Sequence, residues 1–187
     1  SSLKLFNIGD RVVINPVQQC NACDMCLQGH FNLCPNVSTC GVSANGAFAD
    51  YCKVSYTHVY KLPDSTTFEQ AALMEPLACA TFGVNKADIG IGDFVVIFGP
   101  GSIGMMMIQL ARAKGAGKIA LVGIIDYSLD VGRKAGADYV FNTLEKNSPY
   151  YVADLKAKIN ELTDGNLADR VLVPTSAVSA LQQALDV

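Results

Sequence analysis

The carboxyl-terminal half of the chain alternates between short apolar runs and longer segments with helical spacing. An uninterrupted apolar run at 94–98 has the length of a buried strand, and the helical segment 103–114 follows it and ends at Gly115. Three further pairs follow, with strands expected at 118–122, 138–142 and 170–173 and helices at 128–135, 150–163 and 176–186, the last still running where the chain ends. Four strand–helix units in series predict an α/β fold with a parallel sheet and helices on its faces.

The amino-terminal half has shorter apolar runs, which Gly, Asn and Pro residues interrupt. The patterns at 9–16 and 46–54 predict short β-strands joined by loops. After Ser65 the pattern changes and predicts a helix over 67–74 with a capped start. The boundary between the two halves is expected between residues 77 and 92.

Composition excludes several classes of protein. With 187 residues, 50% of them hydrophobic and 17% charged, the chain can bury a large core and is not a disordered one. Its formal charge of −3 and its lack of a basic run make nucleic acid an unexpected partner. The uncharged stretch 94–111 has the length of a membrane span, but Gly99 to Ser102 interrupt it, so no membrane association is expected. Neither end carries a signal-peptide or lipidation motif, and a cytoplasmic location is expected.

An odd count of seven cysteines in a cytoplasmic chain favours metal binding over disulfides. Four of them share the spacing C-x2-C-x2-C-x7-C, namely Cys20, Cys23, Cys26 and Cys34. Four thiolates on one short loop complete a tetrahedral zinc site with no open position, which predicts a structural zinc. A [4Fe–4S] cluster is the alternative, because the first three cysteines have ferredoxin spacing and Pro35 follows the fourth. The spacing before that fourth cysteine is seven residues instead of three, which favours zinc.

The remaining thiols and both imidazoles are expected to have structural roles. Cys40, Cys52 and Cys79 stand alone in the sequence and are interpreted as small core side chains. His30 lies inside the cysteine cluster and His58 in a predicted strand, and neither belongs to a ligand motif.

The turn after the first buried strand of the α/β half carries the pattern G-x-G-x-x-G in Gly99-Pro100-Gly101-Ser102-Ile103-Gly104. This pattern is specific when it follows a strand and opens a helix, as it does here. Gly99 would allow the tight turn, Gly101 the close approach of a pyrophosphate, and Gly104 the packing of helix on strand. The helix amino terminus would bind the phosphates of NAD or NADP. The expected cofactor-binding residues are Gly99, Gly101, Ser102, Ile103, Gly104 and Gly123.

The second strand does not end on the residue that usually selects the cofactor. An acid there would bind the ribose 2′-hydroxyl of NAD, but the strand is expected to end at Gly123 and Asp126 comes late. Asp126 has two open interpretations, a ribose ligand or, with Ser128, a cap of the following helix. No arginine for the 2′-phosphate of NADP is in register either, so only a weak cofactor preference is expected.

Six ordered motifs together carry a resemblance to a known family. They are Gly9-Asp10-Arg11-Val12, the four cysteines, Gly46-Ala47-Phe48-Ala49-Asp50-Tyr51, Lys61-Leu62-Pro63-Asp64, Glu75-Pro76-Leu77 and the glycine-rich turn. In this order they resemble the zinc-dependent medium-chain alcohol and polyol dehydrogenases, in the branch of the sorbitol, butanediol and threonine dehydrogenases.

The resemblance implies a domain organisation and an activity. Residues 1–80 would be part of a mostly β GroES-like catalytic domain whose structural-zinc lobe lies at about 20–34, and residues 81–187 part of a Rossmann dinucleotide-binding domain. The activity implied is hydride transfer between a secondary alcohol or polyol and NAD(P), with a catalytic zinc acting as a Lewis acid. Members of the family are commonly homo-oligomers, dimers or tetramers.

By the same resemblance, Glu75 would lie at the catalytic zinc, as a ligand or through water. The family's other catalytic ligands, a cysteine and a His-Glu pair, precede the Gly-Asp-Arg-Val motif, and this chain has only eight residues before Gly9. The chain is therefore expected to be a truncated central portion without the catalytic zinc and inactive by itself. The alternatives are a non-catalytic dinucleotide-binding module stabilised by zinc, and an iron–sulfur electron carrier.

Overall fold

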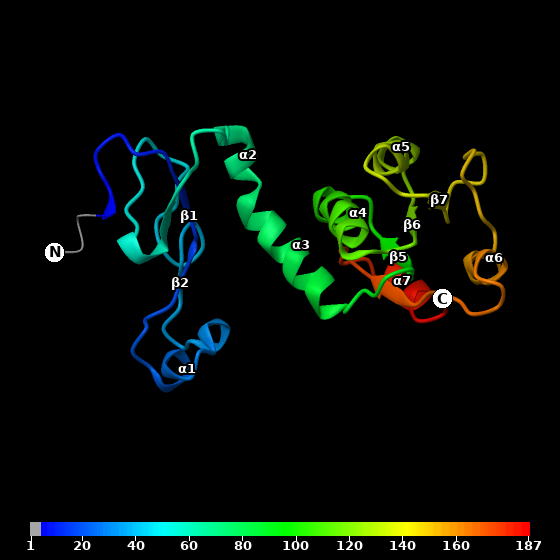
Figure 1. The fold of residues 1–187 in the computed structure, drawn as a ribbon, viewed down its shortest axis with the longest axis horizontal. Coiled ribbons are helices and arrows are strands. Elements are labelled where there is room, and N and C mark those ends of the chain that lie inside the picture. Colours follow the sequence, from blue (N-terminus) through cyan, green and yellow to red (C-terminus); the bar gives the residue numbers. More distant parts are fainter. Residues whose placement is uncertain (1–4) are drawn as a thin grey trace. The chain divides into compact units, whose positions relative to one another are not determined.

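The computed structural model describes residues 5–187, which fold as two compact units, one ending at Glu75 and the other spanning Pro76–Val187 (Figure 1). The first unit contains two small antiparallel pairs, β1 (Val12–Ile14) with β4 (Val59–Lys61) and β2 (Val17–Gln18) with β3 (Ser38–Thr39). Its short helices are α1 (Asp24–Leu27), the 3-10 turns η2 (Phe31–Leu33) and η3 (Tyr56–His58), and α2 (Phe68–Ala72). The strand expected within 9–16 is confirmed as β1.

The helix that was expected to start with a cap after Ser65 is confirmed as α2. The Thr67 side chain accepts a hydrogen bond from the Gln70 amide, and the Gln70 side chain accepts one from the Thr67 amide. This reciprocal arrangement satisfies two amides at the start of the helix that have no partner within it. A second helix, α3 (Met74–Lys86), follows directly and was not expected from the sequence.

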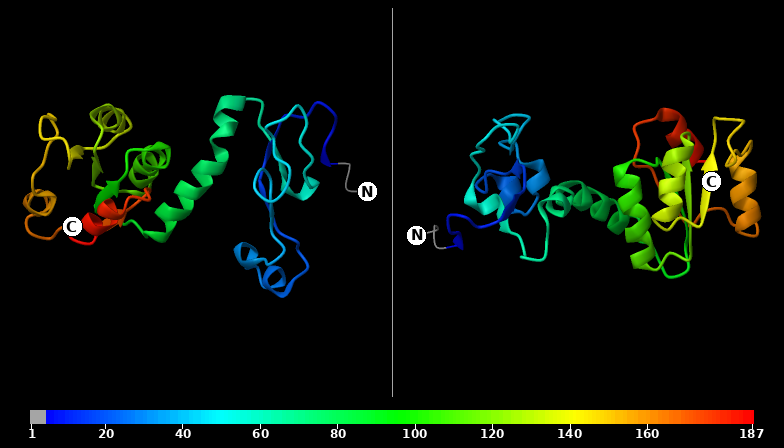
Figure 2. Two further views of the ribbon diagram at one scale, coloured as in Figure 1. Left: turned by 180° about the vertical axis from the view of Figure 1, so that it is seen from behind. Right: turned by 90° about the horizontal axis from the view of Figure 1, so that it is seen from above.

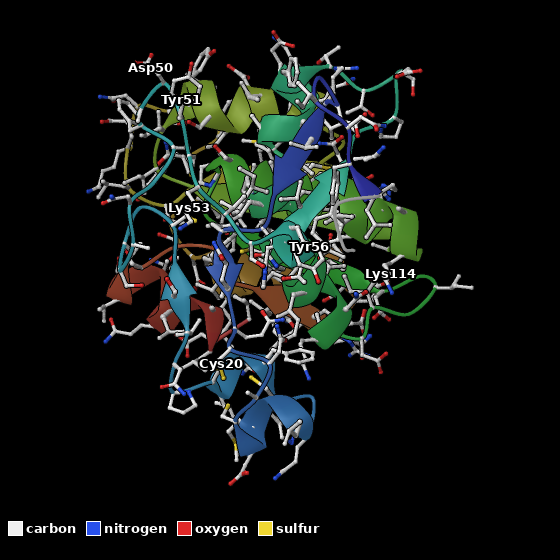
Figure 3. The ribbon with its side chains drawn as sticks, turned by 90° about the vertical axis from the view of Figure 1, so that its left-hand side faces the viewer. Cys20, Asp50, Tyr51, Lys53, Tyr56 and Lys114 are labelled. Atoms are coloured by element: carbon white, nitrogen blue, oxygen red, sulfur yellow. The ribbon has the colours of Figure 1, made fainter. Side chains whose placement is uncertain are left out.

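The strand expected at 46–54 is absent, because these residues form bends and irregular backbone. Phe48 and Tyr51, which supplied the apolar positions of the pattern, are fully or almost fully exposed. Figure 3 shows Asp50 and Tyr51 at the outside of the first unit. An alternating pattern forms a strand only where a neighbour pairs with it and its apolar face is covered, and the described residues provide neither here.

The second unit is built on a parallel sheet with the strand order β7-β6-β5-β8. The strands are β5 (Phe94–Phe98), β6 (Lys118–Gly123), β7 (Tyr139–Asn142) and β8 (Arg170–Leu172), so all four predicted strands are confirmed. The connecting helices are α4 (Ser102–Lys114), α5 (Asp126–Lys134), α6 (Leu155–Leu162) and α7 (Val178–Ala184). The predicted α/β architecture is therefore confirmed.

Helices cover both faces of this sheet (Figure 2). On one face Val95 and Ile97 of β5 pack in a cluster with Ile108 and Ala111 of α4, together with residues of α3 and α5. On the other face Val96 packs with Ile159 of α6 and a residue of α7. All five residues of β5 are buried, which explains the uninterrupted apolar run in the sequence.

Two predicted helix bounds are wrong. The helix expected at 150–163 begins only at Leu155, because Tyr151 bridges to Asn142 beside β7 and Asp154 caps the helix by accepting from the Ala157 amide at 2.9 Å. The helix expected to run to the chain end stops at Ala184, with Leu185 as its C-cap. Within residues 5–187, no helix has both the length and the apolar character that a membrane span requires.

Candidate dinucleotide turn and metal centre

The glycine-rich turn lies where the sheet changes direction. From β5 the chain continues to β6 and β7 on one side, whereas β8 pairs with the opposite edge of β5. In parallel sheets of this kind, ligands bind at the carboxyl ends of the strands where the strand order reverses. Gly99 follows β5 directly at this point, and a Cβ added there would lie 3.1 Å from Thr175 Cβ and 3.3 Å from the Pro174 carbonyl oxygen, both of which follow β8. The sequence motif by itself did not predict that residues 174–175 lie beside the turn.

Two positions of the turn require glycine, one for its backbone conformation and one for lack of space. Gly99 has a φ of +118°, a conformation that L-residues rarely adopt, and its amide donates to the Val122 carbonyl at 2.9 Å. A Cβ added at Gly104 would lie 2.0 Å from the Gly99 carbonyl oxygen. These contacts fit the roles expected of the first and third glycines, a tight turn and close packing of the helix.

Gly101 differs from both. Its φ is −87°, and a Cβ added there would meet no atom within 4 Å. The fold itself therefore does not require glycine at this position, and open space adjoins its backbone. A glycine without an internal reason marks a place where another molecule approaches the backbone.

Helix α4 begins at Ser102, directly beside this open space, and Gly101 at its N-cap supplies no side chain to cap it. The first amides of such a helix lack partners within it, and they point at the region where a phosphate would lie. Ser102 is exposed and Ile103 is half-buried. The turn thus meets the structural requirements of a dinucleotide pyrophosphate site: a switch point, an open glycine and an uncapped helix start.

Of the two interpretations of Asp126, the structure contradicts the helix cap. Strand β6 ends at Gly123, as expected, but Ile125 is the N-cap of α5, so the expectation that Asp126 caps this helix is wrong. Asp126 Oδ1 accepts hydrogen bonds from Asn142 Nδ2 at 2.8 Å and from Ser148 Oγ at 2.6 Å. Its carboxylate joins α5 to the segment after β7.

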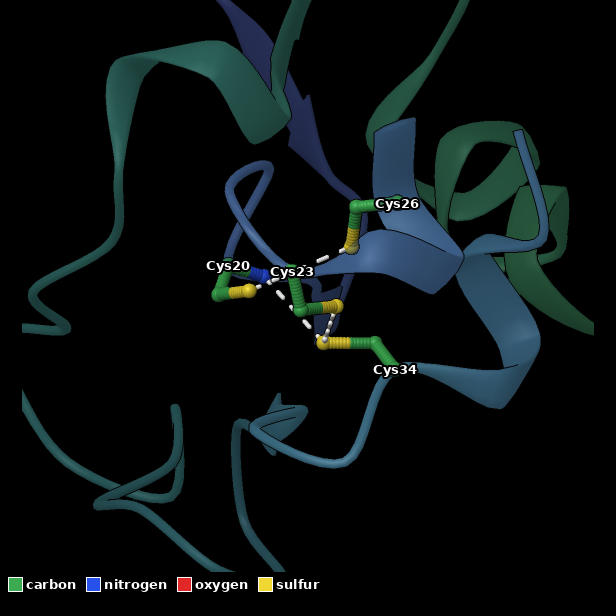
Figure 4. Close-up of side chains that lie close together, drawn as sticks. All are labelled: Cys20, Cys23, Cys26 and Cys34. Atoms are coloured by element: carbon green, nitrogen blue, oxygen red, sulfur yellow. Dashed lines mark hydrogen bonds between the residues drawn. The ribbon is translucent and has the colours of Figure 1, made fainter. Parts of the chain in front are cut away.

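The four clustered cysteines converge in a small lobe of the first unit (Figure 4). Cys26 lies in α1, Cys23 is the N-cap of α1, and Cys34 ends η2. The four sulfur atoms lie within 4.8 Å of one another, with Cys20 Sγ 4.0 Å from Cys26 Sγ and Cys23 Sγ 3.9 Å from Cys34 Sγ. Zinc–sulfur bonds of 2.3 Å in a tetrahedron place the sulfurs about 3.8 Å apart. The donor set and its dimensions could therefore hold a zinc ion.

The thiols of this lobe differ in their ionisation. Hydrogen bonds from the backbone of Ala22 and Cys23 lower the pKa of Cys20 to about 6, whereas burial raises the pKa of Cys26 to about 12. Because zinc binds thiolates, its binding would release the protons that the cysteines hold. Asn36 Nδ2 lies 3.9 Å from Cys20 Sγ as a further donor, which the cysteine spacing gave no means of finding.

Glu75 lies in the first turn of α3 and is exposed. Within residues 5–187, the only group of His, Cys, Asp and Glu side chains close enough to hold a metal is the cysteine lobe. In the part of the chain that the structure describes, Glu75 therefore belongs to no group of three or more such side chains.

The isolated cysteines are not core side chains, and that expectation is wrong. Cys79 is exposed on α3, and Cys40 and Cys52 are only half-buried, because the segments that carry the latter two build little core. His58 lies in η3 instead of a strand and is buried, with its ring nitrogens 2.9 Å from Thr57 Oγ1 and 3.0 Å from Gln19 Oε1. Through its hydrogen bond to Gln19, His58 connects the segment before Cys20 to the residues that precede β4, which is a structural role.

Comparison with known proteins identifies both parts of the chain. Residues 1–64 match the alcohol dehydrogenase GroES-like domain, and residues 102–187 match the zinc-binding dehydrogenase domain. The GroES-like expectation for the first part is thereby confirmed.

Individual relatives agree with this assignment. The sorbitol dehydrogenase of Halalkalibacterium halodurans is 35% identical over 184 residues, which are 97% of this chain and 51% of that protein. The D-arabitol-phosphate dehydrogenase of Enterococcus avium is 34% identical over 95% of this chain and 49% of its own length. The crystal structure of galactitol-1-phosphate dehydrogenase from Escherichia coli has a TM-score of 0.80 at 27% identity and covers 95% of this chain and 49% of its own. The chain thus spans about half the length of the relatives that it matches.

Proposed function

The chain belongs to the family of zinc-dependent alcohol and polyol dehydrogenases, and on this basis we propose that it serves hydride transfer between a secondary alcohol or polyol and NAD or NADP. The observation that carries the proposal is the glycine-rich turn at the switch point of the sheet, where Gly101 faces open space beside the start of α4. The relatives that act on sorbitol and arabitol phosphate support a polyol as the substrate class.

In this proposal the residues of the turn bind and orient the cofactor. Gly99 and Gly104 fix the path of the backbone, and Gly101 allows the pyrophosphate to approach it. The first amides of α4, from Ser102 and Ile103 onward, donate to the phosphate oxygens. When bound, the nicotinamide accepts the hydride from the alcohol carbon.

We propose a structural role for the zinc of the cysteine lobe. Cys20, Cys23, Cys26 and Cys34 would complete its coordination, which leaves no position for substrate or water. The metal would hold α1 and η2 together where the lobe has few buried apolar side chains.

Glu75 is proposed as a ligand of a catalytic metal, or of its water, on the family resemblance alone. Within residues 5–187, Glu75 belongs to no group of three or more potential metal ligands, so no step of the reaction is derived through such a metal. A second candidate function is a dinucleotide-binding module stabilised by zinc that has no turnover by itself, and the open backbone at Gly101 together with the four clustered thiols supports it.

A calorimetric titration of the zinc-loaded chain with NADH tests the binding step, with Gly101→Val as the critical variant. Because a Cβ at 101 meets no protein atom, this variant should fold with an unchanged melting temperature but weaken NADH binding by at least about tenfold. Ala113→Val, on the exposed side of α4, is the matched control and should bind normally. Equal binding by Gly101→Val and the unmodified chain would contradict the proposed site.

Turnover with a panel of polyols separates the two candidate functions. Zinc-dependent oxidation of a polyol supports the dehydrogenase, whereas NADH binding without turnover supports the binding module.

Elemental analysis and the visible spectrum test the identity of the metal. About one zinc per chain is expected, and iron with a broad visible band would identify an iron–sulfur protein instead.

The proposal also includes an oligomeric state and a cellular location. A homodimer or tetramer is supported by exposed apolar side chains of α7, such as Val178 and Leu181, and light scattering of the purified chain tests it. A cytoplasmic location is supported by seven cysteines without a disulfide among the described residues, and fractionation of cells that express the chain tests it.

A further inference from the structure

The end of β6 and the middle of the glycine-rich turn interlock. A Cβ added at Gly123 would lie 2.6 Å from Pro100 Cγ and 2.8 Å from Pro100 Cδ. Both atoms belong to a ring that is tied to the backbone, so they cannot rotate away as the end of a flexible side chain would. Any side chain at 123 therefore conflicts with proline at 100.

This contact limits which residue can occupy position 123, where the ribose of the proposed cofactor would bind. An acid at the end of the second strand binds the 2′-hydroxyl of NAD and repels the 2′-phosphate of NADP, whereas an arginine nearby attracts that phosphate. Here the strand ends in Gly123, and the exposed apolar residues Ile124 and Ile125 follow it. Neither a carboxylate nor a guanidinium occupies these positions.

Asp126 is the next charged residue, and its Oδ1 is engaged elsewhere. That oxygen accepts from Asn142 Nδ2 and Ser148 Oγ, and Asn142 is fully buried. Asn142 Oδ1 in turn accepts from the amides of Leu144 and Glu145 at 3.0 and 2.9 Å. The carboxylate thus holds the segment after β7 against the start of α5, a structural task that fixes its orientation.

We propose that this site binds NAD(H) and NADP(H) with similar affinity, because the contact between Pro100 and Gly123 excludes the acid that would discriminate between them. The inference rests on the proposed function and adds the class of dinucleotide to it. Pro100 and Gly123 are positioning residues in this account. Asp126 is a structural residue that does not bind the ribose.

Calorimetric titrations with NADH and NADPH test the inference directly. The dissociation constants for the unmodified chain should agree within about threefold. Asp126→Ala should lower the melting temperature and speed hydrogen exchange at 142–151, while the ratio of the two constants stays unchanged.

Substitution of the interlocking pair gives the converse test. Gly123→Asp alone should lower the melting temperature because of the conflict with Pro100, and Pro100→Ala with Gly123→Asp should restore it. The double variant should bind NADH at least about tenfold more tightly than NADPH. No gain of preference in a folded double variant would contradict the inference.

The outcomes separate this inference from the function on which it rests. A tenfold preference of the unmodified chain for either dinucleotide, or a selective loss of NADH binding in Asp126→Ala, overturns the inference and leaves the dehydrogenase proposal intact. Failure of both dinucleotides to bind overturns the proposed function, and the inference with it. If the double variant does not fold, the unmodified chain and Asp126→Ala still decide the question.

Discussion

The two units of this chain are stabilised in different ways. In the described part of the first unit the buried apolar side chains are Cys26, Cys34, Leu62 and Ala71, and two of these belong to the metal lobe. In the second unit every residue of β5 is buried between helices on both faces of the sheet. On the proposed zinc site, a metal would take the place of a core in the first unit, whereas apolar burial sustains the second.

The free energies of side-chain burial and of zinc binding are large enough for such an exchange. Burial of one aliphatic or aromatic side chain contributes about 1.5–3 kcal/mol. A structural zinc bound by thiolates contributes about 10–16 kcal/mol of apparent binding free energy in small zinc domains at neutral pH. One metal ion can thus replace several buried side chains, which a lobe of fifteen residues between Cys20 and Cys34 has no means of providing.

Loss of a zinc ligand should have the largest effect, confined to the first unit. We expect Cys26→Ser to reduce the zinc content from about one per chain to nearly none and to unfold the lobe, because zinc binding and folding of the lobe are one process. Elemental analysis and hydrogen exchange check both effects. Cys79→Ser, an exposed cysteine outside the lobe, is the control and should keep its zinc.

A cavity in the sheet should have the next largest effect, confined to the second unit. Ile97 is fully buried in β5, and Ile97→Ala should lower the free energy of unfolding of this unit by about 2–5 kcal/mol. Denaturant unfolding followed by hydrogen exchange of the sheet amides measures this loss of free energy, and Ile97→Val should lower the free energy of unfolding by less. Zinc content should stay unchanged, and a simultaneous loss of zinc would contradict the independence of the two units.

A smaller effect is expected at the edge of the sheet, where Asp138 accepts from Arg112 and from the Ile119 amide. Burial raises the pKa of Asp138, but these hydrogen bonds and the charges of Arg112 and Lys118 outweigh burial and lower it overall. Its stabilisation is therefore present above the ordinary value of 3.8 and is lost as the pH falls below it. We expect Asp138→Asn to cost about 1–2 kcal/mol at pH 7 and to flatten the stability profile below pH 4.

The smallest effect is expected at the cap of α2. Thr67→Ala removes one half of the reciprocal pair with Gln70 and should destabilise the helix by about 1 kcal/mol. Thr67→Ser retains the hydroxyl and should restore most of the loss. Thermal unfolding of the zinc-loaded chain measures both variants, and an effect of Thr67→Ala as large as that of Cys26→Ser would contradict the dominance of the metal.

The comparison also explains which parts of the molecule the sequence could predict. The strand at 94–98 and the helix after it were placed correctly because β5 is buried on both faces and Gly115 ends α4 with a φ of +108°. The four cysteines were grouped correctly because their spacing is a local property. In these places the local pattern and the final environment agree.

The misplaced elements depend on partners that a local pattern does not contain. The alternation at 46–54 resembles a strand, but none of the strands within residues 5–187 pairs with it. The apolar segment from Tyr150 resembles a helix, although Tyr151 forms a β-bridge with Asn142 of β7. The role of Asp126 depended on Asn142 and Ser148, both distant in sequence. The conflict between Gly123 and Pro100 likewise becomes visible only when β5 and β6 lie side by side.

Hydrogen exchange of the whole chain, with zinc bound and after chelation, tests most directly whether the two units are stabilised independently. The account predicts that chelation removes protection from amides between Cys20 and Cys34, such as that of His30, which donates to the Met25 carbonyl. Protection of the β5 and β6 amides should remain unchanged. Equal loss of protection in both units, or no loss in the cysteine lobe, would contradict the account.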